Sequence, residues 1–364
     1  MSKLSIHRIK YFLIEVSSII MTWVIAALVS VYIKFNDIPD HIIHSVYHLP
    51  SKVNRYELYQ TALVIGLVLG VVMSVAHVFL YPLIIKSRNF LLGLLFRLVV
   101  FTFLTFFALY LFLTLSGTPI PLNSEKGLVL FSRSVVDILP YLLIVEMING
   151  LNITLRRNLG RGYFNKLMRN TYFSPRNEYR VFMFIDLKNS TPLADRMGSL
   201  EFSRFIQKCF SDFSATALDF GAEIYQFVGD EVIISWLAKE NFKFSSCMDL
   251  HFAFQKRLKK ASQYYLADFG TLPEFRSSIH CGSVSAALVG VYKSEIAYHG
   301  SVLNLCSRLQ TVCRQYDSPL VISEDFYQKV ASESAYRYEP ISGIELKGVS
   351  KLQLVYKVMA KDIA

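Results

Sequence analysis

The sequence contains few charged residues and few cysteines for its length. Only 18% of its 364 residues are Asp, Glu, Lys or Arg, while 53% are hydrophobic, and the mean hydropathy is +0.37. This balance excludes a disordered chain and argues against an ordinary soluble globular protein. None of the five cysteines forms a C-x-x-C pair, which argues against a zinc site or a disulfide framework. We therefore expect reduced cysteines that pack in a core.

The hydrophobicity is concentrated before residue 155, in four apolar runs. Each of the first three exceeds the roughly 20 residues that a helix needs to cross a bilayer. The fourth is less apolar, because it contains Arg133, Asp137 and Glu146. No A-x-A-like cleavage site follows the first run, so a retained helix is favoured over a signal peptide. The sequence predicts a membrane domain of four transmembrane helices over residues 1–150, with spans at about 11–33, 61–85, 90–115 and 127–148.

Basic residues flank these runs unequally and predict their orientation. They precede the first run, lie between the second and third, and follow the fourth, while the 34–60 and 116–126 loops hold few. The positive-inside rule then places the N-terminus and everything after residue 155 in the cytoplasm of a multi-pass inner-membrane protein. Residues 151–177 are basic and predict a juxtamembrane linker.

From residue 180 the pattern changes to short strands mixed with helices. Helical spacing covers 199–220, 246–267 and 302–313. Strand patterns cover 180–185, 223–228, 232–236, 275–280, 284–291, 320–323, 344–346 and 352–358. We expect an α+β domain over 178–364, with helices over a mainly antiparallel sheet.

Two aspartates follow apolar strands in this half. Asp186 ends one strand and precedes Asn189, Ser190 and Thr191, which open a predicted helix whose free N–H groups suit phosphate oxygens. Asp230 lies in the turn between two strands, after Gly229. Either aspartate alone is typical of a helix cap or a turn. If the strands pair, their carboxylates converge where two Mg²⁺ ions could bind.

Together with their flanks, these blocks resemble class III nucleotidyl cyclases, which make cyclic AMP or cyclic GMP. F-x-D-L-x-x-S-T around Asp186 and F-V-G-D-E-V around Asp230 resemble the metal-binding signatures of that family. The segment 299–308 resembles the family's V-N-x-a-x-R helix, and L-K-G-V at 346–349 resembles its closing segment. The four blocks occur in the family's order and spacing over about residues 178–360.

The resemblance implies a ferredoxin-like α+β catalytic domain and roles for individual residues. Asp186 and Asp230 would hold two Mg²⁺ or Mn²⁺ ions, while Asn189, Ser190 and Thr191 would contact phosphate. In the family the site lies at a dimer interface, so Asn304 and Arg308 would come from the second subunit of a homodimer. Asn304 would orient the ribose and Arg308 would stabilise charge on the α-phosphate. Lys347 would contact the terminal phosphates.

The base-recognition positions depart from the family pattern. Adenylyl cyclases commonly have Lys, and guanylyl cyclases Glu, where this sequence has Gln226. The partner position, often Asp or Thr, is Ala297. An amide can donate or accept a hydrogen bond, so Gln226 is compatible with either purine. We favour ATP as the substrate, because bacterial-type members of this appearance are mostly adenylyl cyclases, and GTP stays open as the alternative.

Other functions fit less of the sequence. A catalytically inactive nucleotide-binding module conflicts with the retention of Asp186, Asp230, Asn304 and Arg308. A transporter would leave the blocks after residue 178 unexplained, and a diguanylate cyclase would need a Gly-Gly-Asp/Glu-Glu-Phe turn that the sequence lacks. The formal net charge of +10 needs no nucleic-acid partner, since many of the basic residues flank the predicted helices.

The membrane domain is larger than an anchor needs, which suggests a sensor for an unknown ligand. Asp137 and Arg97 are the ionisable candidates inside the predicted spans. His41, His44 and His48 share one helical face between the first two spans. These histidines suit either metal or haem ligation or an amphipathic interfacial helix.

Overall fold

The computed structural model describes residues 6–36, 39, 55–80, 99–107, 125–158, 166–167, 169–292, 294–344 and 353–361. The chain divides into two compact units. One contains Ile9–Asn158, and the other contains Met1–Arg8 together with Leu159–Ala364. Each unit is described by itself below. The division into 1–150, 151–177 and 178–364 stays a prediction.

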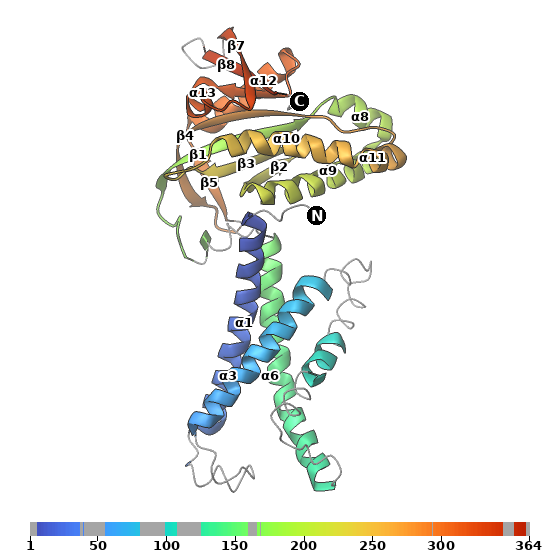
Figure 1. The fold of residues 1–364 in the computed structure, drawn as a ribbon, viewed down its shortest axis with the longest axis vertical. Coiled ribbons are helices and arrows are strands. Elements are labelled where there is room, and N and C mark those ends of the chain that lie inside the picture. Colours follow the sequence, from blue (N-terminus) through green and yellow to red (C-terminus); the bar gives the residue numbers. More distant parts are fainter. Residues whose placement is uncertain are drawn as a thin grey trace. The chain divides into compact units, whose positions relative to one another are not determined.

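Three long helices make up most of the described part of the first unit (Figure 1). They are α1 (Ile6–Phe35), α3 (Arg55–Val75), which continues as the π-helical turn η1 (Ala76–Leu80), and α6 (Glu125–Asn158). Within the described residues, two helices are long and apolar enough to cross a membrane, Ile6–Phe35 and Arg55–Leu80. Of the four predicted spans, the first two are therefore candidate spans by length and composition, and the prediction of four spans is not confirmed.

The third and fourth predicted spans have different outcomes. Residues 99–107 of the third are helical, and the rest of it lies outside the described residues. The fourth forms α6, whose charged residues and Pro140 make it less apolar than α1 or α3. Glu146 of α6 lies 2.9 Å from His77 of η1, so a carboxylate contacts this histidine. His41, His44 and His48 lie outside the described residues.

Close helix packing holds this unit together. A Cβ added to Gly70 of α3 would lie 2.7 Å from the Cα atom of Ile20 in α1, so only glycine permits this approach. The buried side chains around this contact include Ile19, Trp23 and Met73. Trp23 also stacks on Phe101, with ring centroids 6.2 Å apart.

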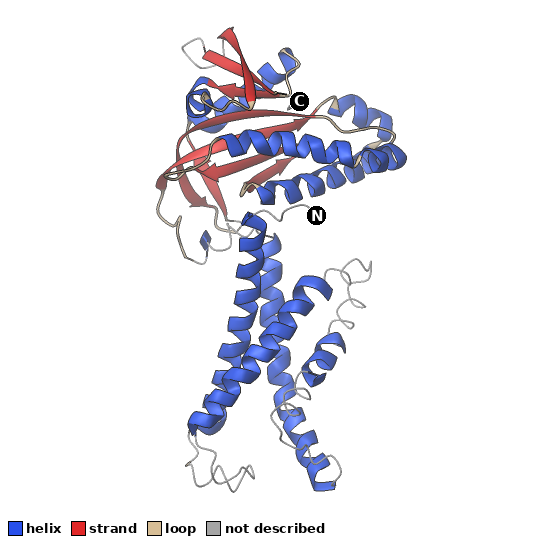
Figure 2. Ribbon diagram, viewed as in Figure 1, coloured by secondary structure: helices blue, strands red, loops and turns tan. Residues whose placement is uncertain are grey.

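The strands described in the second unit form one sheet (Figure 2). Its order is β2-β3-β1-β4-β6-β8-β7, and β5 pairs with β4 off this path. All pairs are antiparallel except β4 with β6, which confirms a mainly antiparallel sheet. The strands are β1 (Arg176–Leu187), β2 (Glu223–Val228), β3 (Glu231–Leu237), β4 (Phe275–Val289), β5 (Glu295–His299), β6 (Leu320–Ser323), β7 (Tyr336–Ile344) and β8 (Gln353–Ala360).

The alternation of side chains along β1 separates two faces of the sheet. Val181, Met183 and Ile185 point into the main core, which α9 and α10 cover (Figures 1 and 2). Phe182 and Phe184 point to the other face, where they pack against α12. The helices of this unit are α8 (Ser190–Met197), α9 (Ser199–Asp219), α10 (Ser245–Lys260), α11 (Ser262–Phe269), α12 (Ser301–Gln315) and α13 (Glu324–Val330).

The sequence pattern locates most of these elements and misses some. The helix expected at 246–267 divides at Ala261 into α10 and α11. The two strands expected at 275–280 and 284–291 are one strand, β4, because Gly282 continues the ladder opposite Arg180. The pattern does not predict β5 or α13, and it places the start of β7 eight residues too late.

Candidate active site

Asp186 lies at the end of the central strand β1, on the face that α12 covers. It pairs in register with Glu231 of β3 and with Arg276 of β4. The residue is only 6% exposed, because β1 is a central strand with β3 and β4 on its two sides. A carboxylate this deep needs a cation or a hydrogen-bond donor to be stable.

Asp230 lies in the tight turn between β2 and β3. Gly229, with φ of +61°, supplies the left-handed backbone that the turn requires. The hairpin places Asp230 directly before Glu231, which is the register partner of Asp186, so the two aspartates are near enough to interact electrostatically. Burial raises the pKa of Asp186, the guanidinium of Arg314 opposes that rise, and the neighbouring Asp230 adds to it.

A third carboxylate stands beside this pair. Burial raises the pKa of Glu231 to about 7, and the negative charge of Asp186 is the next largest cause of this rise. Within the described residues no three His, Cys, Asp or Glu side chains are arranged to hold a metal ion by themselves. Two aspartates still suit Mg²⁺, which prefers oxygen ligands and keeps positions for water and phosphate oxygens.

The chain after β1 turns directly into a helix. Asn189 adopts a left-handed conformation, with φ of 56°, and its side chain does not cap α8. The first backbone N–H groups of α8, at Ser190 and Thr191, therefore have no side-chain cap from Asn189. This helix start offers a site for an anion next to the aspartates.

Asn304 and Arg308 lie one turn apart on α12, as the sequence predicts. The opposite face of the helix packs into the domain through Cys306 and Leu309. Asn304 is exposed and Arg308 half-buried, and neither side chain makes a hydrogen bond or an ion pair among the residues that the structure describes. Lys347 lies outside the described residues.

The two predicted base-recognition residues lie on different strands. Gln226 is exposed on β2, just after a shift of register between Ile224 and Gln226. Ala297 lies on β5, opposite Ala287 of β4. Their neighbours Tyr225 and Tyr298 meet edge to face, with ring centroids 5.1 Å apart, so the two strands approach each other here.

Two arginines beside Asp186 were missed by the sequence analysis. Arg314, near the end of α12, donates hydrogen bonds to Asp186. Arg276 is the register partner of Asp186, and its guanidinium bonds to Asp317, which also pairs with Lys188. Arg276 lies at the start of a predicted strand, so pairing that strand with the strand of Asp186 could have predicted that the two residues lie opposite each other. Nothing in the sequence signalled Arg314.

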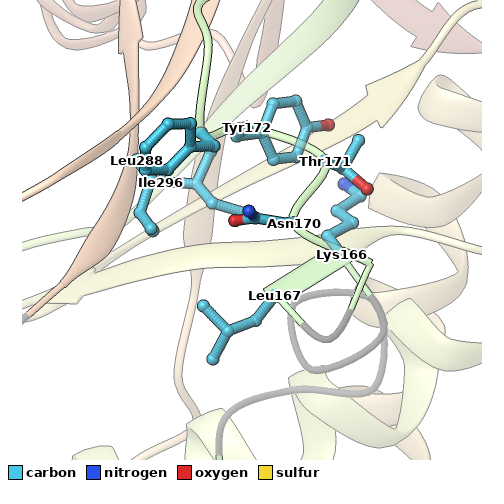
Figure 3. Close-up of a pocket in the computed structure, with 8 residues that line it drawn as sticks. Lys166, Leu167, Asn170, Thr171, Tyr172, Leu288 and Ile296 are labelled. Atoms are coloured by element: carbon cyan, nitrogen blue, oxygen red, sulfur yellow. The ribbon is translucent and has the colours of Figure 1, made fainter.

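The linker packs against the β4–β5 hairpin of the same unit. Tyr172 is 4% exposed and lies with Leu288 and Ile296 around a cavity of about 10 Å³, which leaves room for about one water molecule (Figure 3). The Tyr172 carbonyl accepts a hydrogen bond from the Leu288 N–H at 2.9 Å. The described end of the linker, residues 166–167 and 169–177, is therefore packed as part of this unit.

A buried ionic network begins at the linker. Lys166 pairs with Glu223 at 2.8 Å, and the Tyr172 hydroxyl donates to Glu178 at 2.6 Å. Both carboxylates bind the guanidinium of Arg180, which is fully buried. The Arg180 guanidinium also stands 4.7 Å from the ring centre of Tyr298, next to Ala297. The network thus joins the linker to the strands that carry the base-recognition positions.

Known proteins give a consistent comparison. Residues 174–360 match the model of the adenylate and guanylate cyclase catalytic domain, which is half of the chain. Adenylate cyclase 2 of Rhizobium meliloti (strain 1021) is 30% identical over 212 residues, and the match covers 58% of each chain. The chain thus spans little more than half the length of this curated relative.

A solved cyclase structure shares the fold at low identity, and another is less similar. A bacterial light-regulated adenylyl cyclase has a TM-score of 0.52 at 16% identity, over 62% of this chain and 66% of that one. The adenylyl cyclase CyaB from P. aeruginosa has a TM-score of 0.46 at 20% identity, over 52% and 97%. Together with the strand-end aspartates and the order of the four blocks, the family match shows that the chain belongs to the adenylate and guanylate cyclase catalytic domain family.

Proposed function

We propose that the protein is a membrane-bound adenylyl cyclase that converts ATP to 3′,5′-cyclic AMP and pyrophosphate. The observation that carries this proposal is the convergence of Asp186 and Asp230 beside the start of α8. Carboxylate oxygens and free backbone N–H groups side by side match a metal-bound triphosphate. The adenylate cyclase relative supports the choice of ATP.

The reaction we propose needs positioning and charge stabilisation rather than a covalent intermediate. Asp186 and Asp230 would hold two Mg²⁺ or Mn²⁺ ions, which when bound activate the ribose 3′-hydroxyl and neutralise the triphosphate. The backbone at Asn189, Ser190 and Thr191 would hold phosphate oxygens, and Lys347 would contact the terminal phosphates. The bound nucleotide is thereby aligned for attack of its 3′-hydroxyl on the α-phosphate.

Asn304 and Arg308 would act in the active site of a second copy. The Asn304 side chain is exposed and the Arg308 side chain half-buried on α12, and neither makes a hydrogen bond or an ion pair in the described part of its own chain. In a homodimer, Arg308 would stabilise the charge that develops on the α-phosphate, and Asn304 would orient the ribose. Two equivalent sites would result, each with aspartates from one subunit and α12 from the other.

The proposal also has to specify which purine nucleotide, ATP or GTP, the enzyme uses. Gln226 can donate or accept a hydrogen bond, whereas the side chain of Ala297 can do neither. A guanylyl cyclase is therefore the second candidate, and an inactive nucleotide-binding module is the third. Initial rates with ATP and GTP, measured separately with Mg²⁺ and with Mn²⁺, distinguish the three.

The test uses the full-length protein in lipid nanodiscs. We expect cyclic AMP from ATP, with activity lost in Asp186→Asn and in Asp230→Asn. Asp195→Asn is the matched control, because Asp195 is an exposed aspartate on α8. If both active-site variants retained wild-type rates, the assignment of the metal ligands would be wrong.

A mixing experiment tests the shared site. Asp186→Ala and Arg308→Ala should each be inactive alone, because each homodimer lacks one part of both sites. A mixed population should recover part of the activity, since one site of each heterodimer is intact. Inactive heterodimers, shown to form by differential tags, would contradict the shared site.

We also propose that the membrane domain regulates the cyclase from a multi-pass position in the inner membrane, with the catalytic domain in the cytoplasm. Support comes from two apolar helices and from the Lys166–Glu223 pair, which connects the linker to β2. Lys166→Met should change the basal rate of the full-length enzyme, whereas Arg169→Met, an exposed neighbour, should not. Equal rates in the two variants would argue against this route.

A further inference from the structure

Arg314 makes a close contact with the proposed metal ligand Asp186. Its Nη2 atom lies 2.6 Å from Oδ2 of Asp186, and its Nε atom lies 3.1 Å from the same oxygen. Both donors thus bind one carboxylate oxygen and leave Oδ1 to other partners. Charge-assisted bonds of this kind are among the strong hydrogen bonds in proteins.

The charges around this contact are unbalanced without Arg314. Asp186 near the end of β1 lies opposite Glu231 at the start of β3, and Asp230 lies in the turn just before it, so three negative charges influence one another here. The other nearby cations, Arg276 and Lys188, both pair with Asp317. Arg314 is therefore the cation that contacts Asp186 directly in the described part of the chain.

The two partners differ in their freedom to move. The Asp186 side chain is 8% exposed and fixed on a central strand, while the Arg314 side chain is 60% exposed. Arg314 also lies one residue before the end of α12, outside the buried row of Leu309, Val312 and Cys313. Its guanidinium can leave Asp186 for solvent without opening the core, so the contact is reversible.

We infer that Arg314 is the counter-ion of Asp186 at the proposed metal site, and that it sets the divalent-cation affinity by competing for Oδ2 of Asp186. This inference rests on the proposed two-metal cyclase function. In the metal-free protein Arg314 holds the carboxylate in place and offsets its charge. An incoming cation must displace the guanidinium, so the site fills only at higher metal concentration. Arg314 is a positioning residue, since it acts through Asp186.

Mn²⁺ binding to the full-length protein without nucleotide, followed by electron paramagnetic resonance, tests the inference independently of catalysis. Arg314→Met should bind Mn²⁺ about three- to tenfold more tightly than wild type, the size expected when one unit charge leaves a partly solvated site. Arg314→Lys keeps the charge and should stay near the wild-type affinity. Arg204→Met is the matched control, because Arg204 is a 63% exposed arginine that also pairs with a carboxylate, at 2.8 Å.

The outcomes separate the inference from the proposed function. Asp186→Asn should remove the tight Mn²⁺ site, and if it does not, the metal assignment itself fails. If Asp186→Asn removes the site but Arg314→Met binds Mn²⁺ equally or more weakly, the competition is refuted. Unchanged Mn²⁺ affinity with a raised Michaelis constant for ATP would also refute it, because Arg314 would then be a nucleotide ligand.

Discussion

Removal of the buried Arg180 guanidinium should destabilise the catalytic unit strongly. Arg180 is 0% exposed and binds Glu178 at 2.8 Å, Glu223 at 2.5 Å and Ser235 at 2.9 Å. Arg180→Met would leave two carboxylates facing each other without their shared cation. Breaking a buried ion pair on one side costs about 3–5 kcal/mol. Because the Glu223 side chain is 32% exposed and can be partly hydrated, we expect the lower end of that range.

Fluorescence of Trp236 gives a direct assay. The chain has two tryptophans, Trp23 in the membrane unit and Trp236 in the catalytic unit, so a Trp23→Phe background leaves one reporter. Trp236 is 3% exposed and donates to the Phe220 carbonyl at 3.1 Å, so it reports unfolding of this unit. A loss of about 3 kcal/mol corresponds to a fall in Tm of about 6–12 °C for a unit of this size.

A surface pair and a double variant complete the test. Arg337→Met removes an exposed partner of Glu339 and should cost less than about 1 kcal/mol. Glu223→Gln combined with Arg180→Met should cost less than the sum of the two single changes, because the single changes disrupt the same network. A fall in Tm below about 2 °C for Arg180→Met, or additive effects in the double variant, would refute this account.

Three further predictions concern pH, thiols and helix packing. Burial would raise the pKa of Glu223, but the charges of Arg180 and Lys166 outweigh burial and lower that pKa below its usual 4.5. The ionised Glu223 therefore stabilises the fold above pH 4.5, and this stabilisation is lost as the pH falls further. Urea midpoints measured between pH 3.5 and 7 should show a smaller loss of stability toward acid pH in Glu223→Gln than in the wild type. All five cysteines are buried, and burial raises their thiol pKa values, so an aromatic disulfide reagent should label none in the native protein and all after unfolding. Gly70→Ala should lower the Tm of the membrane unit, because the new Cβ would meet Ile20 at 2.7 Å, whereas Gly150→Ala, with open space around it, should not. The Tm is followed by Trp23 fluorescence in a Trp236→Phe background. Equal effects of the two substitutions would contradict the packing role of Gly70.

Local pattern was sufficient for most elements of the catalytic domain. The strand 223–228 and the helix that begins at Ser199 follow from period-2 and period-3.6 spacing, and the structure places them within one residue of the prediction. The break at Ala261 and the continuity of β4 through Gly282 did not follow, because tertiary contacts override local preference at such points. For the fourth apolar run, the local pattern gives conflicting signals. Its length suggests a membrane span, but its charged residues lower its hydropathy.

Local patterns in the sequence were enough to select the candidate site residues. Asp186 before a helix start, Asp230 after a turn glycine, and Asn304 with Arg308 one turn apart are local patterns, so residue types and short spacings were enough to select them. Only the tertiary structure decided which charges meet. Arg314 is 128 positions from Asp186 in the chain, and Arg180 lies 43 positions from Glu223. Such pairs arise from how β1, β2 and α12 pack, and no local periodicity encodes that distance.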